Sequence, residues 1–127
     1  MKNKAYDAKG KPIDVRGKRV WHFQAIHHDI WDYDLAMGPK LLTVNHDGKD
    51  IDAVALAGKH GFLFVFDRDN GEPLFPIEER PVPASDVSGE AASPTQPWPV
   101  DLPPFARISL SVDELSPYAD PEERAAW

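Results

Sequence analysis

Residues 40–66 carry three apolar segments joined by two short turns and read KLLTVNHDGKDIDAVALAGKHGFLFVF. The first segment is followed by Asp47-Gly48, a dipeptide that favours a tight hairpin because both residues tolerate a positive φ. The second and third segments are almost continuously apolar, and the four-residue turn between them has a glycine at each end. The pattern predicts antiparallel strands at 40–44, 51–57 and 62–66.

A further strand is predicted upstream, at residues 18–25. Trp21 and Phe23 fall on one face of this segment, whereas His22 and Gln24 fall on the other, which is the alternation of a half-buried strand. The fold class is therefore all-β, with a four-stranded antiparallel meander. Because its third and fourth strands are apolar on both faces, the sheet needs neighbours, as one blade of a β-propeller does, or a second copy of the chain.

The remaining segments divide the chain into four parts. Residues 1–17 are polar and form a lead-in arm, 18–75 form the blade, and 76–107 are expected to be an extended Pro-rich loop. Residues 108–127 are expected to form a short helical tail, which ends without a C-cap and looks truncated. The tail's signals are Ser111 with Glu114 as a capping box, and Pro121 at a helix start.

Composition excludes several classes of protein. The 127 residues contain 14 Lys and Arg against 21 Asp and Glu, a net charge of −7, which argues against nucleic-acid binding and against docking on anionic lipid. The absence of cysteine excludes disulfides and thiolate metal sites. No apolar run approaches the roughly 18 residues that a membrane helix needs, and these residues contain no signal peptide.

Chemistry-bearing side chains are concentrated in residues 24–34, QAIHHDIWDYD. Two histidines, three carboxylates and two large aromatics make this an unusual connecting loop, and loops on a rigid sheet often carry function. On residue types alone, a loop fastened by its own hydrogen bonds is the favoured interpretation. A transition-metal site at His27 and His28 is disfavoured, because adjacent residues on an extended segment point to opposite faces.

The meander topology relates this loop to a distant turn. In an alternating sheet, the loop at 26–38 and the turn at 58–61 emerge at the same edge, so Asp32 and Lys59 are predicted to lie within about 10 Å of each other. A carboxylate near an ammonium stays ionised and can act as a base, while the ammonium can stabilise charge on a reacting oxygen. The alternative is a salt bridge at the rim, which contributes little to stability.

The stretch WHFQAIHHDIWDYD, residues 21–34, resembles the signature of quinoprotein dehydrogenases that use pyrroloquinoline quinone (PQQ), specifically the glucose dehydrogenase branch. The resemblance extends over roughly residues 17–105. Its supporting segments follow in the family's order: KHGF at 59–62, VFDR at 65–68, GEPLFPIEERPVP at 71–83, SPTQP at 93–97 and PPF at 103–105.

The resemblance implies a partial β-propeller of the eight-bladed quinoprotein type, with PQQ near the axis and Ca²⁺ beside it. Asp32 is similar to the base that takes the substrate hydroxyl proton, and it could neighbour the Ca²⁺. Lys59 is similar to the residue that hydrogen-bonds the quinone's reactive carbonyl region. The residues that would shape the site are His27, His28, Asp29 and Trp31.

The resemblance also implies a function. The chain is expected to be a fragment of an enzyme that oxidises glucose or another sugar or alcohol, and to be inactive alone. Its partners would be the remaining propeller blades and a respiratory quinone or cytochrome acceptor, and its location the periplasm or the periplasmic face of the membrane. The alternative is a non-catalytic propeller scaffold or binding module that retains the repeat but binds no quinone. A scaffold would have no reason to keep Asp32 and Lys59 at facing positions.

Overall fold

A computed structural model of the chain describes residues 5–6, 12–13, 19–115, 118 and 120–125. Most of the expected lead-in arm, 1–17, lies outside the described residues. Its described parts are two short strands, β1 (Ala5–Tyr6) and β2 (Pro12–Ile13), which pair antiparallel with each other.

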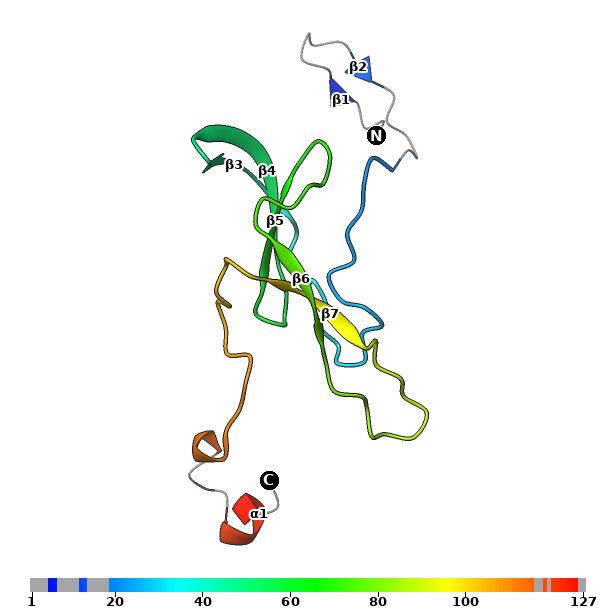
Figure 1. Ribbon diagram of the computed structural model, residues 1–127, viewed down its shortest axis with the longest axis vertical. Coiled ribbons are helices and arrows are strands. Elements are labelled where there is room, and N and C mark those ends of the chain that lie inside the picture. The colour runs from blue at the N-terminus through cyan, green and yellow to red at the C-terminus, as the bar shows by residue number, and fades with distance from the viewer. Residues whose placement is uncertain (1–4, 7–11, 14–18, 116–117, 119, 126–127) are drawn as a thin grey trace.

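The central element is a three-stranded antiparallel sheet in the order β3-β4-β5 (Figure 1). Its strands are β3 (Lys40–His46), β4 (Lys49–Ala57) and β5 (Leu63–Asp67). The three strands predicted within residues 40–66 are thus confirmed. Asp47 and Gly48 connect the first two with φ angles of 52° and 76°, the backbone that a two-residue hairpin requires.

The fourth predicted strand, at 18–25, is absent from the described part of that segment, so the four-stranded meander is wrong. Residues 19–25 instead run in extended form over one face of the sheet. Trp21 Nε1 donates a hydrogen bond to the carbonyl oxygen of Arg68 (2.9 Å), and its ring packs on Phe66 with centroids 5.7 Å apart. Apolar and polar residues alternate in this segment because its aromatic side chains face the sheet. Its backbone does not pair with a strand.

The Pro-rich region is also more ordered than predicted. β6 (Ile77–Pro81) and β7 (Thr95–Pro99) form an antiparallel ribbon in which Glu79 faces Pro97. Proline is tolerated here because each strand of a two-stranded ribbon has one free edge, where a missing amide donor costs nothing. The extended-loop prediction for 76–107 is therefore wrong over these two strands. Figure 1 shows the ribbon crossing the lower end of the central sheet.

The core lies on both faces of β5. Phe64 is 1% exposed and groups with Phe62, Phe66 and Ala25 on one face, where Trp98 of the ribbon packs against them. The opposite face buries Ala53, Val65 and Leu74. Burial on both faces is confirmed for β5, whereas β4 is mostly half-buried.

The tail contains two short helical turns. A 3₁₀ turn, η1 (Val112–Glu114), follows Ser111, whose backbone N–H donates to Glu114 Oε2 (2.8 Å). The predicted helix start at Pro121 is confirmed by α1 (Pro121–Ala125). Within the described residues, no helix is long and apolar enough to cross a membrane.

Candidate functional site

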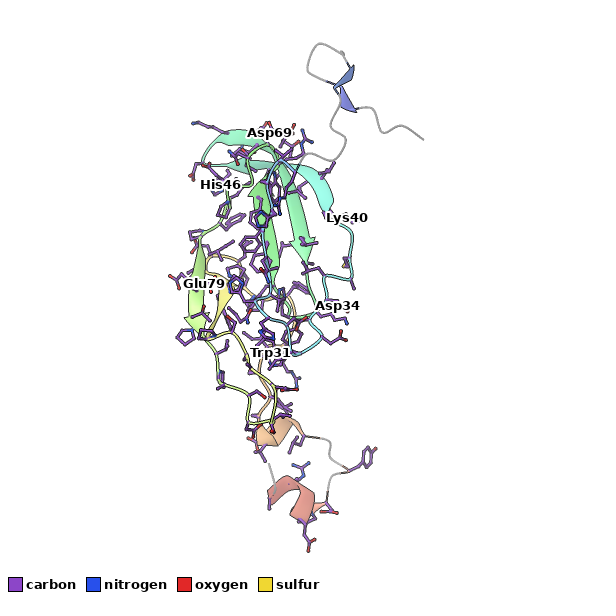
Figure 2. The ribbon with its side chains drawn as sticks, turned by 90° about the vertical axis from the view of Figure 1, so that its right-hand side faces the viewer. Trp31, Asp34, Lys40, His46, Asp69 and Glu79 are labelled. Carbon is purple, nitrogen blue, oxygen red and sulfur yellow. The ribbon has the colours of Figure 1, made fainter. Side chains whose placement is uncertain are left out.

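The acidic loop (residues 26–38) and the turn at 58–61 lie at the same end of the central sheet. Lys59 N–H donates a backbone hydrogen bond to the carbonyl oxygen of Asp34 (3.4 Å), which ties the two segments together. Figure 2 shows Trp31 and Asp34 at this end, with His46 and Asp69 at the opposite end. The topological prediction that the two segments share one edge is therefore confirmed.

Lys59 and Asp32 are in direct contact. Lys59 Nζ donates to Asp32 Oδ2 (3.1 Å), to the Asp32 carbonyl oxygen (3.1 Å) and to Asp34 Oδ2 (3.0 Å). The predicted proximity of Asp32 and Lys59 is confirmed. These contacts use all three N–H bonds of the ammonium.

The contact shifts the protonation of both partners. The hydrogen bond from Lys59, followed by its charge, lowers the pKa of Asp32. The hydrogen bonds to Asp34 and then to Asp32 raise the pKa of Lys59. Asp32 is therefore an ionised, solvent-accessible carboxylate at neutral pH, which is the state that a proton acceptor requires.

The acidic loop adopts an unusual backbone. His28 and Asp32 have φ angles of 44° and 60°, a left-handed region that side chains other than glycine rarely occupy. Asp29 Oδ1 accepts the N–H of Trp31 (3.0 Å), which closes a local turn between these two positions. Trp31 in turn stacks on Tyr33, with ring centroids 5.9 Å apart.

His27 joins the acidic loop to the β6–β7 ribbon. Its Nε2 lies 2.9 Å from Glu79 Oε1, and this hydrogen bond is the main cause of a lowered pKa for Glu79. Its backbone N–H donates to Gln96 Oε1 (2.8 Å), and its carbonyl oxygen accepts from Gln96 Nε2 (2.7 Å). His28, by contrast, is exposed. Of the two adjacent histidines, the structure places only His27 in this junction.

The His60 ring lies against Gly58 within the turn that carries Lys59. A Cβ on Gly58 would lie 2.5 Å from His60 Cε1, so only glycine leaves room for the ring. His60 Nδ1 accepts the N–H of Phe62 (3.2 Å), which places the proton of the neutral ring on Nε2. Burial lowers the pKa of His60, against an opposing effect of the Asp29 charge. Nε2 is itself buried and has no hydrogen-bond partner in the described part of the chain.

A hollow of about 590 Å³ opens beside Lys59. Its volume is within the range of small-molecule sites, roughly 300–1,000 Å³. The acidic loop, the turn at 58–61 and the ribbon all border it, and its lining includes Trp31, Tyr33, Lys59, His60, Phe62, Gln96 and Trp98. The hollow thus combines flat aromatic walls with one ammonium group, and the Asp32 carboxylate lies next to that group.

The described residues contain no cluster of three or more His, Cys, Asp or Glu side chains that could hold a metal ion. An ion beside Asp32 would need most of its ligands from elsewhere.

Three residues of this site were missed by the sequence interpretation. Asp34 shares Lys59 with Asp32 and belongs to the same acidic motif, so the spacing of two residues could have indicated it. Glu79 and Gln96 lie on opposite strands of the ribbon. Neither was predicted as a site residue, because the Pro-rich region was interpreted as a loop.

Comparisons with known proteins identify the family to which the chain is similar. A family model for the glucose, ethanol and alcohol dehydrogenase β-propeller domain that uses PQQ matches residues 13–126. Glycerol dehydrogenase large subunit of Gluconobacter oxydans is 42% identical over 94 residues, which cover 72% of this chain and 13% of that protein. Probable quinate dehydrogenase (quinone) of Xanthomonas campestris pv. juglandis is 38% identical over 100 residues, or 78% of this chain and 13% of that protein.

A third relative is the quinoprotein glucose dehydrogenase of Escherichia coli, 40% identical over 82 residues, which cover 65% of this chain and 10% of that protein. This chain therefore spans 10–13% of the length of these three relatives. No solved structure matches it significantly. The extent of the family match shows that the chain belongs to the PQQ-dependent quinoprotein dehydrogenases, within their β-propeller domain.

Proposed function

We propose that this chain supplies one wall of the substrate-oxidising site of a PQQ-dependent sugar or alcohol dehydrogenase. The observation that carries the proposal is the contact between Lys59 Nζ and Asp32 Oδ2 at 3.1 Å, next to an aromatic hollow. The family implies PQQ as the cofactor. When bound, PQQ supplies the redox chemistry by accepting the hydride equivalent from the substrate carbon.

The residues around the hollow fit such a cofactor. PQQ is a flat, conjugated ring system with carbonyl and carboxylate oxygens. The indoles of Trp31 and Trp98 border the hollow and offer flat apolar surfaces, and Lys59 offers a positive N–H donor. The hollow is open along one side of the described residues, so this chain contributes a wall and other segments would complete the enclosure.

Asp32 would act as the general base. Its carboxylate is exposed and is kept ionised by Lys59, so it can accept the proton of a substrate hydroxyl at Oδ1 or Oδ2. Lys59 would hold the reactive carbonyl region of the cofactor. Because Asp32 and Asp34 already use its three N–H bonds, Lys59 must release one of these contacts to donate to another oxygen.

The residues proposed to shape the site have separate tasks. His27 anchors the acidic loop to Glu79, and Asp29 fixes the turn that precedes Asp32. Trp31 borders the hollow. His28, the residue before Asp29, has the positive φ angle that sets the course of the loop there. A Ca²⁺ ion next to Asp32 is also proposed. Because Ca²⁺ takes about six to eight oxygen ligands, most of them would come from other segments.

Glucose or another sugar or alcohol is the proposed substrate class. Curated relatives are named for glycerol, quinate and glucose, all of which carry hydroxyl groups. We further propose the remaining propeller blades as the structural partners and a respiratory quinone or a cytochrome as the electron acceptor. A periplasmic or periplasm-facing location accompanies these proposals.

The test is turnover by the whole protein that carries this chain, reconstituted with PQQ and Ca²⁺. Dye reduction is measured with a panel of glucose, glycerol, quinate and ethanol, against a control without PQQ. PQQ-dependent reduction with one or more of these substrates is expected. A folded protein that binds no PQQ and oxidises none of them would favour the alternative, a non-catalytic propeller scaffold or binding module.

A further inference from the structure

The carboxamide of Gln96 makes a two-point contact with the backbone of one residue in the acidic loop. Its Oε1 accepts the N–H of His27 at 2.8 Å, and its Nε2 donates to the carbonyl oxygen of the same residue at 2.7 Å. A side-chain amide has the same donor and acceptor arrangement as a peptide group. Gln96 therefore pairs with His27 much as a neighbouring strand would.

The strand that carries Gln96 is fixed to the sheet. Trp98, on the same strand, packs on Phe62 with ring centroids 4.5 Å apart, and the Arg80 guanidinium lies 5.0 Å from the Trp98 ring. Pro97, between Gln96 and Trp98, is buried. Gln96 therefore lies on a strand that is packed against the core. Its two hydrogen bonds fix the position of His27 relative to that core.

The loop needs such support because its backbone is strained. His28, immediately after the contact, and Asp32 both have positive φ angles. Backbone of this kind costs roughly 1–3 kcal/mol per residue and persists only where surrounding contacts hold it. On one side of the strained segment, Lys59 holds Asp32; on the other side, Gln96 and Glu79 hold His27.

We propose that Gln96 is a positioning residue, which holds the acidic loop in the backbone conformation that presents Asp32 to Lys59 and to the substrate. As a role in catalysis, this inference rests on the proposed function. As a statement about the loop, it can be tested on the chain without any cofactor. Gln96 also borders the hollow. Its two hydrogen bonds are to the His27 backbone, and its proposed action on the reaction is through the position of Asp32.

The first test measures hydrogen exchange of the His27 amide by NMR in the full chain. Gln96→Met keeps the length and volume of the side chain and removes both hydrogen bonds. It should speed exchange at His27 about tenfold, the effect of losing hydrogen bonds of ordinary strength. Gln96→Glu keeps an acceptor for the His27 N–H but faces the His27 carbonyl with a carboxylate, so its exchange rate should be intermediate.

Asn45 provides the control, because its side-chain Nδ2 donates to Asp50 Oδ1 at 2.8 Å in the β3–β4 hairpin, at the other end of the sheet. Asn45→Leu removes an amide of similar size and should leave exchange at His27 unchanged. Amides in the β4–β5 pairing report on the fold itself and should stay protected in every variant. Unchanged exchange at His27 in Gln96→Met would overturn the proposal. Equal loss of protection in the sheet would also overturn it, because Gln96 would then support the fold in general.

The second test measures catalysis in the whole protein loaded with PQQ and Ca²⁺. Misplacing a catalytic group by about 1 Å can cost roughly a hundredfold in rate, so kcat should fall about 10- to 100-fold in Gln96→Met, with a smaller change in KM. Asn45→Leu should keep the original kcat. If Gln96→Met also keeps it, the positioning role is wrong. If the unaltered protein shows no PQQ-dependent turnover, the proposed function fails, while the exchange experiment still tests the contact.

Discussion

Lys59 Nζ lies 3.1 Å from Asp32 Oδ2, although 27 residues separate the two positions. Both side chains are substantially exposed, at 42% and 81%, so the pair contributes little to the free energy of folding. The backbone at Asp32 is meanwhile held at an unfavourable positive φ. The pair therefore adds little stability, while the backbone at Asp32 carries a strain that is typical of functional sites. This combination favours a functional role for the ionised carboxylate and the ammonium.

Removing the charge of Asp32 should abolish most of the proposed activity. In the whole PQQ-loaded protein, Asp32→Asn keeps the shape of the side chain and removes the proton acceptor. Turnover should fall by about two to four orders of magnitude, the usual range for loss of a general base. PQQ affinity should change less. The measurement is steady-state dye reduction combined with a PQQ titration.

Asp69→Asn is the matched control for this variant. Asp69 lies at the opposite end of the sheet from the acidic loop (Figure 2), and the substitution changes the same atoms. It should leave turnover unchanged. If Asp32→Asn is as active as Asp69→Asn, then Asp32 is a structural residue, and the contact with Lys59 is an ordinary salt bridge.

The contact between His27 and Glu79 should stabilise the loop less as the pH falls. A hydrogen bond from His27 lowers the pKa of Glu79, so the contact stabilises the folded loop above the ordinary glutamate pKa of about 4.3. That stabilisation is lost as the pH falls through the lowered value. Carboxyl NMR should report a Glu79 midpoint below the ordinary one, and His27→Ala should raise it.

Glu114 is the internal reference for this titration. Hydrogen bonds from Ser111, far from His27 in the chain, lower its pKa. Its midpoint should therefore be the same with and without His27→Ala. A Glu79 midpoint that also stays constant would show that His27 does not determine it.

Gly71 should tolerate no side chain, because Trp21 covers it. Both Gly71 and Gly48 have positive φ, 79° and 76°, but a Cβ on Gly71 would lie 2.5 Å from Trp21 Cδ2, whereas Gly48 faces open space. Gly48→Ala should lower the free energy of unfolding by about 1–2 kcal/mol from backbone strain. Gly71→Ala should cost about 1–3 kcal/mol more from overpacking, as measured by urea denaturation. Equal losses in the two variants would contradict the packing of Trp21 on this turn.

Turn chemistry and apolar runs together were enough to predict the central sheet from sequence. Asp47-Gly48 and the glycine-bounded turn at 58–61 fix where the chain reverses, and the apolar run of β5 is buried on both faces. Alternation around Trp21 was not enough to predict a strand. An extended segment whose aromatic side chains pack against a sheet has the same period of two as a paired strand.

The same reasoning explains which site residues could be predicted. Asp32 and Lys59 were placed at one edge because every second connection of a meander returns to the same edge. The first strand of that meander does not form, but the segment in its place packs on the same sheet, and the Asp34 carbonyl oxygen still accepts the Lys59 N–H. Gln96 could not be predicted in this way. Its contact depends on a ribbon built from a proline-rich segment, in which the missing amide donors hide the strand signal.

The chain by itself should neither bind PQQ tightly nor oxidise sugars. Its hollow is bordered by aromatic walls and Lys59 but stays open, and an open wall leaves a flat cofactor largely in water. The described residues also offer no cluster of ligands for Ca²⁺. Calorimetric titration of the purified chain with PQQ and Ca²⁺ should therefore show no stoichiometric binding, and adding glucose should reduce no dye. Tight binding with glucose-dependent dye reduction would instead show that the chain completes the site, for which association of several copies is the simplest route; a sedimentation measurement on the same sample would reveal it.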